Sequence, residues 1–362
     1  MMKISLAKQL LPKSLHDEIE RIILANNDKR AKPNSRYRLD DDRVRSTVSS
    51  ATRIERSALV LLAFAQLWQM SFRIKTTNAL SERHVRRLVD RWDAENLCSG
   101  TLRTRISYLR TFAEWIGKPG MVGYPKKYFS AERIKRSGIA TTDRSWEAKG
   151  IVPEDVIRRA LEIDERLALY LSLQRDFGLR VKESIELRPA RALSQGNDIL
   201  VVEDGTKGGR PRVIKIETEA QKKTIEWALA VAGKSEFGRI RWRYKSFKQA
   251  QSRFYHLMRD RLGINRKEAD VTAHGLRHGF THKFYGRRTG LPTPVEGGAL
   301  GQIDHQTHTK AGLEVSRALG HSRLSITGAY YGSYGHKLRG TTKVVVKPTT
   351  INFSFRPTVP FA

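Results

Sequence analysis

The sequence predicts a mainly α-helical protein with one small antiparallel β-sheet, in which an all-helical domain precedes an α+β domain. Three hydrophobic patterns of helical period follow one another between residues 57 and 118. Two apolar, β-rich runs between residues 199 and 217 are joined by a glycine-rich segment, which is typical of a hairpin. A chain of 362 residues is long enough for two or three domains, each with a core of its own.

The charge of the chain indicates the class of partner. There are 67 Lys and Arg against 37 Asp and Glu, a formal net charge of +30, and the basic residues recur along the whole chain. Such an excess predicts a polyanionic partner. RNA or an anionic membrane surface would also satisfy the charge, but a long nucleic acid duplex best fits basic residues spread over several domains.

The sequence also bears on the compartment. Cys98 is the single cysteine, so no intramolecular disulfide is possible and a reducing compartment is expected. Residues 1–26 lack the apolar core of a signal peptide, and the most apolar window, residues 59–72, is too short to span a bilayer. We expect a cytoplasmic protein that associates with the nucleoid and not with a membrane.

Residues 1–56 are predicted to form a basic N-terminal arm or linker. An amphipathic stretch from Leu10 to Leu24 is followed by a polar and basic segment up to about Arg38. This second part is expected either to become ordered on DNA or to serve as a solvated tether.

Residues 57–144 are predicted to form the helical DNA-binding domain. In the second helical pattern, Val85, Leu88 and Trp92 share one face, and in the third pattern Leu102 and Ile106 do the same. The arginines fall on the other faces, where they are available to phosphates. The candidate DNA contacts are Arg83, Arg87, Arg103, Arg105 and Arg110.

Residues 145–340 are predicted to form a second, catalytic domain, and residues 341–362 an extended tail. A connector rich in Gly, Pro and Lys covers residues 117–150, and a helix is expected to open at Pro153 and continue to about Gln174. The hairpin that follows presents Lys207 at its tip, and helices are expected from there to about residue 335.

A set of polar residues in this second domain lies where turns and helix starts are expected. The set consists of Arg180, Lys207, His274, Arg277, His321 and Tyr330. Taken one at a time, these residues carry little information, because an arginine is common on a basic surface and a histidine or tyrosine often packs in a core.

Taken together, in order, spacing and local sequence, they resemble the tyrosine recombinase family, which includes the integrases of phages and conjugative elements. The family's three boxes match Gly-Leu-Arg at 178–180 with Glu183 one turn on, His-Gly-Leu-Arg-His-Gly-Phe at 274–280, and Leu-Gly-His-Ser at 319–322, with Tyr330 nine residues after the last histidine. The resemblance covers residues 150–335 strongly and the preceding helical segment more weakly.

The resemblance implies both a fold and a function. The fold is an all-α, SAM-like core-binding domain followed by a tyrosine recombinase catalytic domain. The function is site-specific recombination that integrates or excises a mobile element through a 3′-phosphotyrosyl intermediate. The implied partners are specific sites on double-stranded DNA, three further copies of the chain in a tetramer on DNA, and accessory proteins that bend DNA. No metal, ATP or other cofactor is implied.

The resemblance also assigns roles, and the chemistry explains why those residue types are needed. Arg180 and Arg277 would clamp the phosphate, since guanidinium stays charged and donates paired hydrogen bonds to phosphate oxygens. Tyr330 would attack, His274 would act as acid and base with support from His321, and Lys207 would protonate the leaving 5′ oxygen.

Two departures from the family pattern leave questions open. The interval from Arg277 to His321 is longer than usual by about twenty residues, an insertion near 287–310 that reads as a loop. Tyr331 and Tyr334 also lie close enough to Tyr330 to compete for the nucleophile's role.

Three other functions fit parts of the sequence. A metal-dependent nuclease would use histidines spaced by four on one helix face, together with ligands from the insertion. Its candidate ligands are His274, His278, His282, Asp304, His305 and His308. A type IB topoisomerase would share the six catalytic residues, and a DNA-binding protein that has lost catalysis would keep the charge.

Overall fold

The computed structural model describes residues 9–27, 48–135, 138–206, 209, 211–233, 238–298, 301–321 and 324–334. In this part of the chain helices dominate and the one sheet is a two-stranded antiparallel hairpin, which confirms the predicted fold class. Three sequence predictions lie outside the described residues, namely the basic segment up to Arg38, Lys207 and the tail 341–362.

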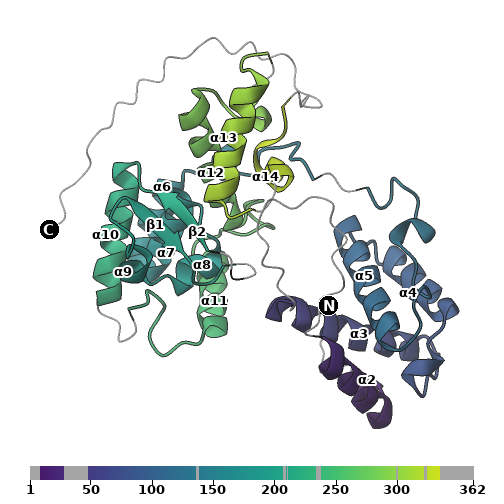
Figure 1. Ribbon diagram of the computed structural model, residues 1–362. Helices are drawn as coiled ribbons and strands as arrows, with labels where there is room; N and C mark the ends of the chain where they lie inside the picture. The colour runs from purple at the N-terminus through teal and green to yellow at the C-terminus, as the bar shows by residue number, and fades with distance from the viewer. Residues whose placement is uncertain are drawn as a thin grey trace.

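The first hydrophobic core is formed by four helices. These helices are α2 (Lys13–Asn26), α3 (Ser50–Gln69), α4 (Glu82–Ala94) and α5 (Ser99–Trp115), which lie at the lower right of Figure 1. The apolar stripes predicted for the second and third patterns are buried in this core, and Arg83 and Arg87 are exposed on the opposite face of α4. Helices α3 and α4 begin at serine caps, and the Ser49 hydroxyl of α3 accepts a hydrogen bond from the Thr52 amide.

Helix α2 lies within the stretch that the sequence predicts as an arm. Its residues Leu15, Ile19 and Ile23 are buried in the same core as α3 and α5. Asn27, at its end, donates a hydrogen bond to the Arg53 carbonyl on α3. The amphipathic stripe of a short helix is stable in water only when it is covered, and here α3 covers it.

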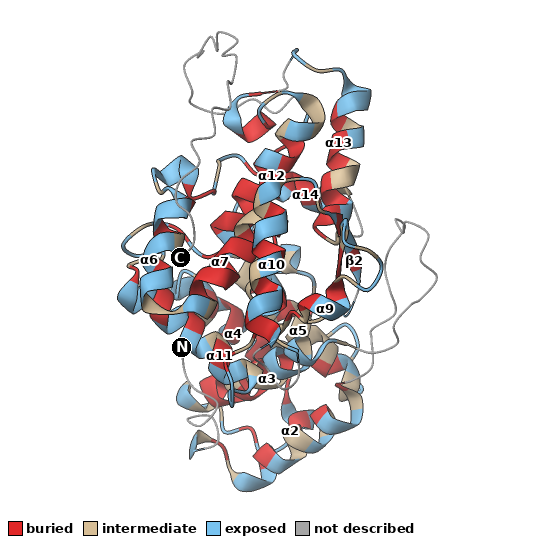
Figure 2. Ribbon diagram, turned by 90° about the vertical axis from the view of Figure 1, so that its left-hand side faces the viewer, coloured by how far each residue is buried: buried red, intermediate tan, exposed pale blue. Residues whose placement is uncertain are grey.

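The second core surrounds helix α7 (Glu165–Phe177), which is buried on nearly all sides (Figure 2). The sequence predicts one helix from Pro153 to about Gln174, and this is wrong in one respect. The chain forms α6 (Pro153–Ile163) and then α7, because Asp164 adopts an extended conformation and its carboxylate caps α7 at the Leu167 amide. Helices α6, α8 (Val181–Glu186) and α10 (Glu219–Gly233) pack against α7. Helix α9 (Pro189–Ala192) packs on α10, and α11 (Phe247–His256), which is continued by a π-helical turn at Leu257–Arg261, packs on α8.

The predicted hairpin is present. Strand β1 (Ile199–Val202) pairs antiparallel with β2 (Arg212–Lys215), with Val202 opposite Arg212. Alternation along β2 buries Arg212 and Ile214 and exposes the two residues between and after them. A charged side chain therefore points into the core from this strand.

A third cluster of buried residues joins α12 (His274–Thr289), α13 (His305–Ala318) and α14 (Leu324–Tyr331). The prediction of a loop over 287–310 is therefore only partly right, since α12 continues to Thr289 and α13 begins at His305. Between them lies a short 3-10 turn, Pro294–Glu296, whose residues Pro294 and Val295 pack against Gly332 just beyond α14. Periodicity missed these helix ends because Gly, Thr and His are weak helix formers whose helices depend on tertiary packing.

A helix that crosses a bilayer must be long and almost wholly apolar. None of the described helices combines the length and the apolar character that a membrane crossing needs.

Candidate active site

The site begins at a tight turn between α7 and α8. Gly178 ends α7 in the left-handed conformation, with φ of 58°, and the ring of Phe280 from α12 occupies the space where a Cβ would stand. The turn packs against α12 and leaves Arg180 as the residue that precedes α8. The side chain of Arg180 is 25% exposed, so one of the predicted arginines stands at the mouth of the site.

Glu183 organises the arginines from inside the protein. Its fully buried carboxylate accepts hydrogen bonds from the Arg180 amide and Nη1, both at 2.7 Å, and from Arg212 Nη1 and Nη2 at 2.8 and 2.7 Å. Burial opposes the charge of Glu183, but the hydrogen bonds and charge of Arg212 prevail and lower its pKa to about 2. Glu183 is thus an anion at any working pH and holds two guanidinium groups in fixed orientations.

Arg277 is 1% exposed and is fixed by backbone carbonyls. Its Nη1 donates to the Gly178 carbonyl, and its Nη2 donates to the Leu319 carbonyl at 2.6 Å. Burial, and then the charge of Arg180, lower the pKa of Arg277 to about 10, which still leaves it charged at neutral pH. Its Nε is buried and has no hydrogen-bond partner among the described residues, so one donor of Arg277 is left unsatisfied.

Three guanidinium groups therefore share one carboxylate. Arg180, Arg212 and Arg277 all interact with Glu183, which leaves an excess of two positive charges in a partly desolvated site. Such an excess suits a phosphate, whose negative charge would be stabilised more strongly here than in water.

Tyr330 lies beside this cationic group. The guanidinium carbon of Arg277 is 5.8 Å from the centroid of the Tyr330 ring. The rings of His278, His321 and His274 surround the same ring, with centroids at 4.7, 5.3 and 5.5 Å. The long interval between Arg277 and His321 does not keep these residues apart, because Arg277 binds the carbonyl of Leu319 directly.

The two histidines of the predicted set are neutral at pH 7. Burial, and then the charge of Arg277, lower the pKa of His274 to about 4 and that of His321 to about 3. The Nδ1 atom of His321 is 3.1 Å from the Thr327 hydroxyl on α14. A neutral imidazole has a free lone pair on one nitrogen, so each ring can accept a proton.

The other tyrosines face elsewhere. The ring of Tyr331 stacks on Tyr285 at 5.4 Å, and its hydroxyl lies against Gly312 of α13, where a Cβ would not fit. Burial raises the pKa of Tyr331 to about 12. Tyr334 is exposed and donates a hydrogen bond to the Ile303 carbonyl.

The structure brings together five of the six predicted catalytic residues, namely Arg180, His274, Arg277, His321 and Tyr330. The sixth, Lys207, lies outside the described residues. Sequence reasoning missed Arg212. The available signal was its position in β2, where alternation places it on the same face as the apolar Ile214.

The five arginines predicted to contact DNA lie in different environments. Arg83 and Arg87 are exposed on α4. Arg103 donates a hydrogen bond to the Ile134 carbonyl, and the guanidinium carbon of Arg110 is 4.2 Å from the centroid of the Tyr124 ring. Arg105 is mostly buried, 3.7 Å from a Glu95 oxygen and 5.3 Å from the centroid of the Trp92 ring. Arg83, Arg87 and Arg103 are therefore the exposed members of this set.

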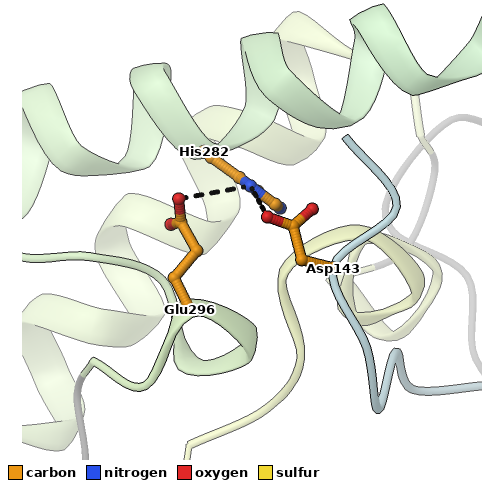
Figure 3. A group of neighbouring side chains, drawn as sticks. All are labelled: Asp143, His282 and Glu296. Atoms are coloured by element: carbon orange, nitrogen blue, oxygen red, sulfur yellow. Dashed lines mark ion pairs between the residues drawn. The ribbon is translucent and has the colours of Figure 1, made fainter. Parts of the chain in front are cut away.

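The histidines and acids proposed as metal ligands do not assemble into one site. His308 is hydrogen-bonded through Nδ1 to the Tyr285 hydroxyl at 2.8 Å, and Asp304 caps α13 at the Thr307 amide. Within the described ranges, one group of three side chains offers ligand atoms within 4.8 Å of one another, and it consists of Asp143, His282 and Glu296 (Figure 3).

Two protein-family models match parts of the chain. A family model described as Integrase matches residues 137–283, and one described as Phage integrase, N-terminal, matches residues 44–122. The two matches together span more than half of the chain. No curated protein matches the sequence.

Several solved structures are similar in fold. A lambda integrase (75–356) dimer bound to a COC′ core site has a TM-score of 0.56 and 16% sequence identity, covering 92% of this chain and 99% of that chain. The XerH site-specific recombinase bound to palindromic difH substrate, in a post-cleavage complex, has a TM-score of 0.53 and 15% identity, covering 89% of this chain and 94% of that chain.

Proposed function

The chain belongs to the tyrosine recombinase (integrase) family, and we propose that it recombines DNA at specific sites through a covalent bond between Tyr330 and a DNA phosphate. The observation that carries this proposal is the convergence on Tyr330 of Arg277, His274 and His321 from two other parts of the chain. The family also accounts for the two-part fold, in which a helical region with exposed arginines precedes the region that holds the site.

Arg180 and Arg277 bind the phosphate that is attacked. Attack by a phenol builds negative charge on the two non-bridging oxygens, and donors fixed in advance stabilise that charge more in the transition state than in the ground state. The exposed side of Arg180 supplies such a donor directly, and the unpartnered Nε of Arg277 supplies a second one when DNA binding uncovers it. A lost donor of this kind costs about 3 to 4 kcal/mol of activation free energy.

The proton of the nucleophile passes to a histidine. A tyrosine phenol is protonated at neutral pH, so attack requires a nearby acceptor. His274 and His321 are both neutral and both flank the Tyr330 ring, and bound phosphate would raise the proton affinity of either imidazole by its negative charge. We assign His274 as the acid and base, with His321 as its support at the phosphate.

The bonds and charges balance without an external energy source. The Tyr330 oxygen forms a bond to phosphorus while the bond from phosphorus to the 5′ oxygen breaks, and Lys207 gives that oxygen a proton. The product is a 3′-phosphotyrosine and a free 5′ hydroxyl. The new ester keeps the free energy of the phosphodiester, so a second strand's hydroxyl can reverse the step without ATP, and the arginines supply the positive charge that a metal provides in other phosphoryl-transfer sites.

The partner in this proposal is double-stranded DNA. Among the solved structures that are similar in fold are a lambda integrase dimer on its core site and XerH on difH. We infer that this chain also binds double-stranded DNA, because its excess positive charge and the exposed Arg83 and Arg87 suit phosphate contacts. The working unit is a tetramer on two DNA sites, and proteins that bend DNA assist it.

Trapping of the covalent intermediate tests the proposal. A pool of nicked duplexes of random sequence is incubated with the protein, SDS-resistant adducts are collected, and the recovered sequence provides a single suicide duplex, called here the selected duplex. The wild-type protein is expected to form the adduct, also in EDTA, and Tyr330→Phe to form none. Tyr331→Phe, the matched control, is expected to keep the adduct. An adduct with Tyr330→Phe would overturn the assignment of the nucleophile, and loss of the wild-type adduct in EDTA would favour metal chemistry.

A further inference from the structure

His282 contacts the backbone of Tyr330 and is not among the residues that carry out the proposed chemistry. It lies on α12, two turns after His274, and is buried. Its Nε2 is 3.2 Å from the backbone carbonyl oxygen of Tyr330. Its Nδ1 is 3.4 Å from a carboxylate oxygen of Asp143 and 3.5 Å from one of Glu296, as Figure 3 shows.

These neighbours fix the protonation of the ring. A carbonyl oxygen only accepts hydrogen bonds, so Nε2 must donate. The two carboxylates also only accept when ionised, so Nδ1 must donate as well, and the ring between them is an imidazolium. Burial works against this charge, but Asp143 and Glu296 outweigh it and raise the pKa of His282 to about 10.

The two carboxylates belong to segments that the proposed chemistry does not use. Asp143 lies in the connector between the two cores, in which the Ala140 amide also donates a hydrogen bond to the Gly328 carbonyl of α14 at 2.8 Å. Glu296 lies in the insertion between α12 and α13, where the Thr293 amide and hydroxyl bind its other oxygen at 2.9 and 2.7 Å. Both segments therefore reach the helix that carries Tyr330.

We propose that His282, held by Asp143 and Glu296, is a positioning residue that fixes the backbone of Tyr330 and thereby links the connector and the insertion to attack on DNA. The inference rests on the proposed function, because it takes Tyr330 as the nucleophile. The imidazolium touches neither DNA nor the reacting atoms. It anchors one end of the peptide unit from which the phenol projects, and the hydrogen bond of the connector to Gly328 anchors the same helix half a turn earlier.

The expected effect is on rate and not on affinity. A displacement of a reacting group by about 1 Å costs roughly 100-fold in rate even when every group that performs the chemistry remains. His282→Gln keeps a side chain of similar length but loses the charge and one of the two donors. Its adduct formation on the selected duplex should slow by about that factor, with the dissociation constant for DNA unchanged.

A double-mutant cycle separates positioning from a general structural role. Glu296→Gln alone should slow adduct formation by a smaller factor, since Asp143 still pairs with the ring. In the His282→Gln background the same substitution should add almost nothing, because the carboxylate acts only through the ring. Glu296 is one third exposed, so its variant is the one expected to fold normally. If His282→Gln unfolds, Glu296→Gln carries the test, and an unchanged rate in that variant would overturn the proposal.

His308→Gln is the matched control. His308 is also a buried histidine with a hydrogen bond to a neighbouring helix, through Tyr285 on α12, but it contacts no residue of the proposed chemistry. This variant should keep the wild-type rate. A wild-type rate in His282→Gln, or additive losses in the double variant, would contradict the inference. Tyr330→Phe separates a failure of the positioning role from a failure of the proposed function. If Tyr330→Phe still forms the adduct, the proposed function is wrong. If Tyr330→Phe forms no adduct and His282→Gln forms it at the wild-type rate, only the positioning role is wrong.

Discussion

Arginines on α4 and arginines around Glu183 have the same charge but opposite environments. Arg83 and Arg87 are exposed to water, where salt screens their charge over about 10 Å. Arg277 and Arg212 are buried, and each is held by a carbonyl or carboxylate oxygen. Burial of a charge costs free energy that only such partners offset. The exposed arginines are thus suited to affinity for any DNA, and the buried ones to stabilising charge at one phosphate.

The two regions also differ in how their arginines depend on neighbours. Within the described part of the chain, Arg83 and Arg87 form no side-chain hydrogen bond or ion pair, so removal of either leaves no partner unpaired. Removal of Glu183 would leave Arg212 buried without its carboxylate and Arg180 without its anchor. The predictions below test this contrast, beginning with the largest expected effect.

Glu183→Gln should lower the free energy of unfolding by about 3 to 5 kcal/mol, the usual cost of leaving one member of a buried ion pair alone. Urea unfolding followed by circular dichroism measures it. Glu82→Gln is the control from the first core, since Glu82 pairs with Arg86 and Lys127 at the surface and its loss should change stability little. Equal losses in both variants would show that burial does not distinguish the two regions.

The stability that His282 provides should depend on pH. Its pKa is raised in the folded protein to about 10, from an ordinary value of 6.5, so its contribution is complete below pH 6.5 and is lost as the pH rises to about 10. The difference in unfolding free energy between the wild type and His282→Gln should therefore shrink across this window, by at most about 1.4 kcal/mol per pH unit.

Urea unfolding of both proteins at pH 6, 8 and 10 measures this difference. Asp143 and Glu296 have lowered pKa values, so their contributions are lost on the acid side, as the pH falls below their ordinary range, and do not confound the comparison above pH 6. A difference that stays constant from pH 6 to 10 would mean that the ring is not charged in the folded protein.

Exposed arginines should affect mainly the salt dependence of DNA binding. Arg83→Ala and Arg87→Ala should each reduce the slope of the logarithm of the affinity against the logarithm of the salt concentration by about one. Fluorescence anisotropy with a duplex of mixed sequence at several KCl concentrations measures the slope. Arg105→Ala should reduce it less, because that side chain is paired with Glu95 and packed on Trp92. A slope unchanged in the double Arg83, Arg87 variant would remove α4 from the DNA interface.

Much of the fold could be predicted because its signals are local. Apolar residues of helical period predicted α4 and α5, and the glycine-rich segment between two apolar runs predicted the hairpin. The break at Asp164 was missed because the second core covers α7 on all sides, so residues 167–174 are all buried and show no periodicity. The ends of α12 and α13 were missed because the helices there depend on contacts with α14 and not on propensity.

For the site, the order and spacing of the three sequence motifs identified six candidate catalytic residues. The roles of these residues stay predictions. The motifs did not identify the residues that hold these six candidates in place. Arg212 lies in a strand and His282 reads as one of several spaced histidines, so neither has a local signal for its partner.

The sequence by itself determined the charge, the helical class, the family and the candidate residues, because each is written in composition or in short spacings along the chain. The tertiary structure alone decided which arginines are buried, that Arg277 binds the carbonyls of Gly178 and Leu319, and that Asp143 and Glu296 meet at His282. Those pairings join residues from 14 (296 − 282) to 139 (282 − 143) positions apart, and no local pattern records which distant group will satisfy a buried charge.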